Sequence, residues 1–482
     1  MPHKIKCLAV MLIIVTLLTG CKGKNRFAPP NGLDVYYINE SKGENKDTAT
    51  TSVVSDNKSS SNKVSKTSSD KKTNSEREES KKEEKSVWDK DYVENIPQSL
   101  KDKGVYMLLS RELLPFEEKV ILEFERQTGM DVTVEVVPQK DYLSKLAVMV
   151  GEGTAPDVAE IGFANLYSTA AYFTPLDNDT FRLEDKIWDT EYMQGVKYKG
   201  NYFGLSIKGA PRTEGNNYVT YYNKSILTAA GITATPYELY LSGRWNWTNQ
   251  RNIAEKLKTC GKGLTPISLE GMDLYMLSAG VDFVLPAANG FASALSDSAV
   301  QSIIYESFEE LRLLKSKNML TQFNPYGFQN GEIGMVSAKA FHMYNSDSFC
   351  LGFNGESSQL EAVPIAGPTQ ETAHTPLKGI CLGVPKGAKN IEGAAYFIRY
   401  FLDPKNADTG NLFYNSQFKK VYSEITKGEN VKKQCAFSEG ILNAEQDGLY
   451  SEICNAAANA NKGETLNKVL SYKEKIDNAV KK

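Results

Sequence analysis

Two tryptophans stand two residues apart in the stretch LSGRWNWTNQ, residues 241–250, of a chain that has four tryptophans in all. Indole faces are large and apolar, so Trp245 and Trp247 could stack on a bound ligand. The pair also precedes a helical pattern of apolar residues, residues 253–257, for which Thr248 is the expected N-cap. Spacing alone leaves two interpretations open, a ligand platform and the start of a helix.

Groups that could perform catalysis are scarce. Of the three histidines, only His342 and His374 lie beyond the first residues, which argues against a histidine triad or a multi-histidine metal site. The motifs G-x-x-x-x-G-K-[ST], H-E-x-x-H and G-x-S-x-G are absent. Asp and Glu are plentiful, but no spacing singles out a glycosidase-like pair. We predict a protein that is not an enzyme and that holds no metal and no cofactor.

Bulk properties narrow the class further. At 482 residues the chain is long enough for two or three domains. Its formal net charge of -3 provides no basic field for nucleic acid, so we expect no nucleic-acid partner.

The first residues are typical of an export signal. Lys4 and Lys6 precede an apolar run over residues 8–18, which is shorter than the about 20 residues that span a bilayer. Residues 18–21, LTGC, resemble the lipobox of bacterial lipoproteins, in which the cysteine carries a diacylglyceryl group. This resemblance predicts a signal peptide over residues 1–21, lipidation at Cys21, and a protein anchored to the cell membrane on its extracellular side.

Residues 22–95 are predicted to be a disordered tether. Their central part is dominated by Ser, Thr, Lys, Glu, Asp and Asn, and it cannot bury enough apolar area to offset the entropy of ordering. Both charge signs are mixed along it, which favours a solvated spacer over a membrane-binding basic segment.

Five of the seven cysteines lie beyond Cys21, and no pair of them has C-x-x-C spacing. A single bridge between Cys435 and Cys454 is possible, and buried free thiols are the alternative.

The folded part is expected to begin near Val105 as an α/β domain. VYMLLS has strand length, PFEEKVILEFERQTG has apolar residues at helical spacing and ends at Gly129 in a capping position, and DVTVEVVP alternates as a strand. Strand, helix, strand is the unit of a parallel sheet, and the pattern continues through a helix and a strand over residues 141–162. Four further helices are predicted, at residues 249–259, 298–317, 391–402 and 466–480.

Several stretches, in order, resemble the family 1 extracellular solute-binding proteins, the lipid-anchored receptors of bacterial ABC importers of the maltose-binding type. FERQTGMDVTVEVVP followed by DYLSKLAVMVGEGTAPDVAEIG resembles the opening of the family. YFGLSI and YYNKSILTAAGI resemble its crossing from one lobe to the other. WNWTNQRNIAEKLK, NGEIGMVSAKAF and KGICLGVPKGAKNIEGAAYFIRYFL complete the set, which covers residues 105–406.

This resemblance implies a two-lobed periplasmic-binding-protein type II fold that closes over a solute. It predicts a first lobe from residues 96–213 with 357–402, and a second lobe from residues 214–356 with 403–482. It also implies a monomer that delivers a small solute, a sugar or oligosaccharide, to ABC permease subunits. A solute-sensing or surface-binding lipoprotein is the alternative, followed by an extracellular carbohydrate-active enzyme.

The resemblance also points to ligand-binding positions, in the loops after first-lobe strands, at the crossing, and on the second lobe. Phe341 falls where relatives commonly have a tryptophan that stacks on a sugar, and the smaller ring weakens the case for a large oligosaccharide. The predicted ligand-binding residues are Arg111, Glu112, Phe163, Asn165, Tyr167, Arg212, Glu214, Asn216, Trp245, Phe341, Lys378 and Gly379.

Each of these positions has a structural alternative. Tyr167 and Phe341 could be core residues, Arg212 and Glu214 could form a surface ion pair, and Asn165 could cap a helix instead of binding ligand. In relatives the tryptophan stretch leads into a helix, which favours a packing role for Trp247 and leaves Trp245 as core or cleft.

Overall fold

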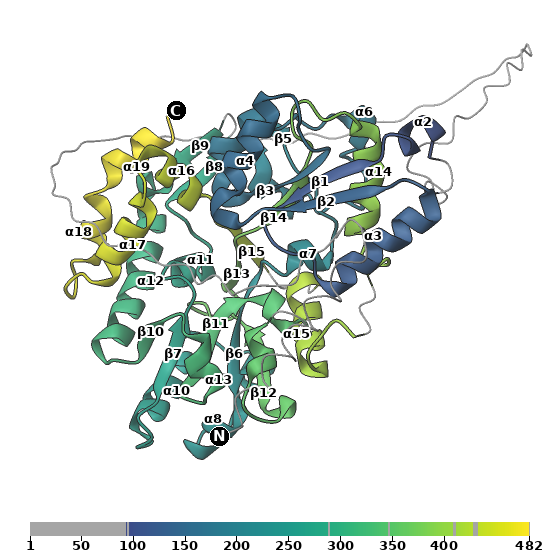
Figure 1. The fold of residues 1–482 in the computed structure, drawn as a ribbon. Coiled ribbons are helices and arrows are strands. Elements are labelled where there is room, and N and C mark those ends of the chain that lie inside the picture. The colour runs from purple at the N-terminus through teal and green to yellow at the C-terminus, as the bar shows by residue number, and fades with distance from the viewer. Residues whose placement is uncertain are drawn as a thin grey trace, which may run out of the picture.

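The computed structural model describes residues 93, 96–287, 290–345, 348–407, 411–427 and 432–481 (Figure 1). The predicted signal peptide, Cys21, and the predicted tether apart from Val93 lie outside the described residues.

A four-stranded sheet in the order β14-β3-β1-β2 forms the centre of the first lobe. β1 pairs in parallel with β2 and β3, which confirms the predicted strand-helix-strand units, and β14 joins β3 antiparallel. Gly129 has a φ of 69° and ends α3 as predicted, because a left-handed cap suits glycine. The elements are α2 (Gln98–Lys101), β1 (Val105–Leu109), α3 (Pro115–Thr128), β2 (Val132–Val136), α4 (Gln139–Gly151), β3 (Val158–Gly162), α5 (Leu166–Thr169), α6 (Asn178–Phe181), β4 (Lys197–Tyr198), β5 (Asn201–Tyr202), β14 (Ile380–Gly383) and α14 (Ile391–Leu402).

A five-stranded sheet in the order β10-β7-β11-β6-β12 forms the centre of the second lobe. β12 pairs antiparallel with β6, although the predicted division assigned residues 357–402 to the first lobe. The chain therefore leaves the second sheet only after Pro364. The elements are β6 (Tyr218–Asn223), α8 (Lys224–Ala229), α9 (Pro236–Leu241), α10 (Trp247–Thr259), β7 (Thr265–Leu269), α11 (Leu274–Ser278), β8 (Val284–Ala287), β9 (Gly290–Ser293), α12 (Ser298–Ser316), β10 (Leu320–Gln322), α13 (Pro325–Gln329), β11 (Ile333–Lys339) and β12 (Leu360–Pro364).

Short elements lie between the two sheets (Figure 1). These are α7 (Pro211–Glu214) and a two-stranded parallel sheet of β13 (His374–Leu377) and β15 (Lys432–Cys435). Asn217 bridges Leu377, so two segments that connect the lobes lie side by side.

Of the C-terminal helices, α17 and α18 pack against α12 and α15 packs against β12, whereas α16 also contacts α5 of the first lobe. The helix predicted over residues 466–480 is broken into two at residues 471–472. The Ser471 hydroxyl donates to the Lys468 carbonyl oxygen over 2.7 Å and competes with the helical pattern there. The helices are α15 (Ser416–Lys427), α16 (Ser438–Glu445), α17 (Leu449–Ala458), α18 (Thr465–Leu470) and α19 (Lys473–Ala479).

Both tryptophans of the opening pair are in the core. Trp245 is 1% exposed and donates its indole N–H to Pro364 over 2.8 Å, and the Trp247 indole donates to Ala366 over 2.9 Å. The two indoles thus hold the chain where it leaves β12. The predicted N-cap was wrong, because Asn246 caps α10 through a bond from the Asn249 N–H, and Trp247 is already the first helical residue.

No helix within the described ranges is long and apolar enough to cross a membrane. The described cysteines are free, and Cys435 and Cys454 are buried thiols rather than a bridge.

Asn390 ties α14 to the start of the first sheet and provides a test of this packing. Its buried side chain caps α14 and donates to the carbonyl oxygens of Leu100 and Gly104, over 3.2 and 2.7 Å. We expect Asn390→Ala to lower the free energy of unfolding by about 2–4 kcal/mol, because α14 loses its cap and two carbonyl oxygens, one buried and one part-buried, lose their donor. Urea titration measures this, with Asn461→Ala at an exposed position as the control. Equal losses in the two variants would contradict the packing.

Candidate functional site

The candidate site begins where the first-lobe strands end. Arg111 and Glu112 follow β1, and Phe163 and Asn165 follow β3. Neighbouring parallel strands end at one edge of a sheet, which is where α/β folds bind ligands. The structure therefore brings these predicted residues to the same edge.

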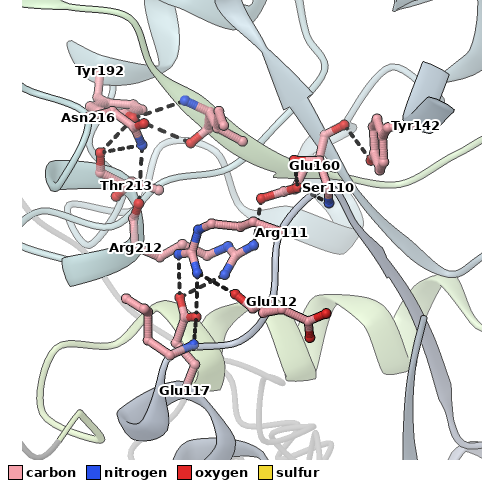
Figure 2. Close-up of polar contacts among 12 residues, drawn as sticks. Ser110, Arg111, Glu112, Glu117, Tyr142, Glu160, Tyr192, Arg212, Thr213 and Asn216 are labelled. Carbon is pink, nitrogen blue, oxygen red and sulfur yellow. Dashed lines mark hydrogen bonds and ion pairs between the residues drawn. The ribbon is translucent and has the colours of Figure 1, made fainter. Parts of the chain in front are cut away.

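A buried ion network joins this edge to the crossing segment (Figure 2). On α7, the Arg212 guanidinium contacts Glu117 over 2.7 Å and Glu160 over 2.5 Å. Arg111 adds a two-pronged contact to Glu117 over 3.0 Å, and Ser110 donates to Glu160 over 2.6 Å. The network connects α3, β3, the end of β1 and the crossing at a single point.

Opposite charges dominate the electrostatics of the network. Burial alone would raise the pKa of Glu117, but the guanidinium groups of Arg111 and Arg212 outweigh it and hold the pKa at about 2. The same partners lower the pKa of Glu160, and the carboxylates raise the pKa of Arg212. Arg212 is thus a buried structural cation, and the alternative of a surface ion pair with Glu214 was wrong.

Glu214 has its own buried partner. Lys433 on β15 contacts it over 3.1 Å and Asp189 over 3.5 Å, while burial raises the pKa of Glu214. Asn216 donates to the Arg212 and Thr213 carbonyl oxygens over 3.2 Å each. Glu214 and Asn216 thus fix the backbone of the segment that crosses between the lobes.

The predicted aromatic residues have protein partners. Phe163 is buried edge-on against Tyr192 at 5.2 Å, and its ring occupies the space that a Cβ on Gly379 would need. The rings of Tyr167 and Tyr198 meet edge-on, with their centroids 5.9 Å apart. Phe341 lies 3.9 Å from the ring of His342 and remains partly accessible.

Asn165 was predicted either to bind ligand or to cap a helix. Its side chain makes no cap hydrogen bond to α5, which removes the capping alternative. It lies beside Gly162 at the end of β3 and is partly accessible.

A second polar cluster lies where the second-lobe strands end. Glu270 follows β7 and accepts from the Tyr218 hydroxyl over 3.3 Å and from the backbone N–H of Lys339, the last residue of β11, over 3.1 Å. Lys378, in the turn into β14, contacts Asp273 over 2.9 Å and Glu439 over 3.4 Å. Lys378 was predicted, and it brings these acidic groups to the first-lobe sheet.

The two lysines of this cluster differ in their electrostatics. Burial lowers the pKa of Lys378 but Asp273 and Glu439 outweigh it, so the pKa is raised. Burial lowers the pKa of Lys339, and Glu270 only partly opposes this. The Lys339 ammonium makes no hydrogen bond or ion pair with another described residue, and its side chain is partly accessible. It is therefore a donor available to a ligand.

Sequence reasoning missed Glu270, Asp273, Lys339 and Glu439. The rule that polar residues at strand ends line a site was applied only to the first lobe. Applied to the buried runs TPISL and IGMVSAK, it would have found Glu270 and Lys339. Nothing local marks Glu439, because a long-range contact brings it to Lys378. Among the described residues, no group of three possible metal ligands gathers.

Two α/β lobes joined by crossing segments, with charged side chains where the strands of both lobes end, form a two-lobed binding protein. The chain belongs to the bacterial extracellular solute-binding protein family, whose model matches residues 110–408.

Comparison with individual proteins agrees with this family. The chain is 24% identical over 268 residues to the erythritol/L-threitol-binding protein of Mycolicibacterium smegmatis, and the match covers 51% of this chain and 54% of that protein. The chain thus spans about half the length of this curated relative.

Solved structures share the fold. An ABC substrate-binding protein from Listeria monocytogenes, in complex with cycloalternan, is 18% identical with a TM-score of 0.52, covering 78% of this chain and 97% of that one. The galacto-N-biose-/lacto-N-biose I-binding protein of Bifidobacterium longum, in complex with lacto-N-biose, is 14% identical with a TM-score of 0.58 and the same coverage.

The buried network makes a prediction about stability and pH. Arg212→Met leaves Glu160 buried without its guanidinium, so we expect a loss of about 3–5 kcal/mol at about pH 7. Lowering the pH to about 4.5 should shrink the deficit, because a protonated Glu160 no longer needs that partner. In the wild type, the stabilisation from Glu117 is complete above the ordinary pKa of a glutamate and is lost progressively as the pH falls toward the folded-state pKa of about 2.

Urea titration at both pH values measures the effect. Arg126→Met, at an exposed pair with Glu123, is the matched control and should leave the midpoint unchanged. A deficit that is the same at both pH values would contradict the electrostatic origin.

Proposed function

We propose that the protein binds a small polyhydroxylated solute, a sugar or polyol, between its two lobes and delivers it to the permease of an ABC importer. The observation that supports this is the polar cluster of Glu270, Asp273, Lys339, Lys378 and Glu439, contributed from strand ends and loops of both lobes. Binding at this cluster joins the lobes through the solute.

The mixed charges suit hydroxyl groups. A sugar hydroxyl both donates and accepts, so one ring can donate to Glu270 and accept from Lys339 without carrying any net charge. Hydrogen bonds to charged groups are worth about 1.5–3 kcal/mol each, and a site that holds unpaired donors rejects solutes that cannot satisfy them. Phe341 offers a partly accessible apolar face to the carbon side of the same ring.

The remaining parts of the proposal concern the setting. Cys21 carries the lipid anchor, the tether over residues 22–95 holds the lobes away from the membrane on its extracellular side, and the protein acts as a monomer without enzymatic turnover. The names of its relatives support a carbohydrate or polyol as the solute, and the extracellular family supports a surface position.

Removing the available ammonium tests the site. A solute that binds only the native state at a hundredfold excess over Kd raises the free energy of unfolding by about 2.7 kcal/mol, which a thermal-shift screen of sugars and polyols detects. We expect Lys339→Met to weaken binding of the best compound roughly tenfold or more, without lowering the midpoint of the free protein.

Lys262→Met, on an exposed loop, is the control and should bind as the wild type does. Unchanged affinity in Lys339→Met would remove Lys339 from the site. A screen in which no sugar or polyol shifts the midpoint would overturn the proposed solute class.

A further inference from the structure

The first turn of α16 packs directly against the first-lobe loop that follows β3. A Cβ added to Gly440 would lie 1.6 Å from the carbonyl oxygen of Ala164, so only glycine permits this approach. Ala164 lies between the predicted ligand residues Phe163 and Asn165. The edge of the first sheet at β3 is thus covered by a helix that continues from the second lobe.

This helix is held on both sides. The buried carboxylate of Asp282, just before β8, accepts from the N–H groups of Phe437 and Ser438 over 2.8 and 3.0 Å. On α16 itself, Glu439 contacts Lys378 over 3.4 Å. The helix therefore cannot swing away from the loop without breaking buried contacts.

Aromatic faces beside α16 are used by the protein. Tyr198 on β4 stacks on Phe291 of β9, with ring centroids 6.0 Å apart, and Tyr167 meets Tyr198 edge-on. The ring of Phe291 in turn contacts that of Phe437, with centroids 5.7 Å apart. A row of aromatic rings thus connects the lobes along the flank of α16. These rings are not free to stack on successive sugar units.

We propose that α16 is an end wall of the binding site and limits the solute to a polyol, a monosaccharide or a disaccharide. This inference rests on the proposed function and names its substrate class. A chain of sugar units needs an open cleft and several apolar faces to lie on, because each ring presents one. Here one end is closed by α16. Of the predicted aromatic residues, Phe341 and Tyr167 are partly accessible, and Tyr167 already packs edge-on against Tyr198, while charged hydrogen-bonding groups line the rest.

A graded panel of ligands tests the size limit on the wild-type protein. The probes are erythritol and other tetritols, pentoses, hexoses, and the di-, tri- and tetrasaccharides of the same hexoses, each followed by thermal shift and calorimetry. We expect a compound no larger than a disaccharide to bind most tightly, with at least tenfold weaker binding of its longer homologues. A trisaccharide or larger glycan that binds more tightly than every smaller compound would overturn the size limit and leave the proposed function standing. If no saccharide or polyol binds, the proposed function itself fails.

Gly440→Ala tests the wall directly. Alanine favours a helix, so only the contact with Ala164 opposes it, and we expect at least a tenfold loss of affinity for the best small compound. Gly151→Ala at the end of α4, where a Cβ would meet open space, is the matched control and should bind normally. Wild-type affinity in Gly440→Ala would contradict the proposal that α16 forms an end wall of the binding site. The panel decides the size limit even if this variant does not fold.

Discussion

The guanidinium of Arg212 reaches two carboxylates that come from different elements, Glu117 on α3 and Glu160 on β3. Two acids and a cation buried together are stable only as a set, because removing any member leaves an uncompensated charge. Since Arg212 belongs to the segment that crosses between the lobes, the set fixes where the crossing leaves the first sheet. The positions of the strand ends, and hence of every candidate ligand group on the first lobe, follow from that point.

The second lobe is positioned by a comparable device. Lys433 on β15 neutralises Glu214 at the other side of α7, and two indole N–H groups hold the chain as it leaves β12. The polar cluster then lies between two sheets whose connecting segments are held by these contacts. Preorganised groups of this kind bind a hydroxylated solute without first having to be ordered, which lowers the entropic cost of binding.

Much of the fold was predictable from local patterns. The alternating and helical spacings over residues 105–162 predict β1, α3, β2, α4 and β3 correctly, because those patterns reflect burial on one face of each element. The site was less predictable. Arg212 was named as a ligand residue, but its burial depends on Glu117 and Glu160, which lie far away in the chain. Likewise, the sequence left Trp245 open as a sugar platform, and only its contact with Pro364 places it in the core. The contact of Gly440 with Ala164 could not be predicted from the residues around either position.

The central claim is that a solute lies between the strand ends of the two sheets. A crystal structure of the protein with the saccharide or polyol that gives the largest thermal shift tests it most directly. The account predicts the solute within hydrogen-bonding distance of Lys339 and Glu270, with its ring or carbon chain against Phe341. A solute bound elsewhere on the protein, with Lys339 and Glu270 left in contact only with water, would contradict the account.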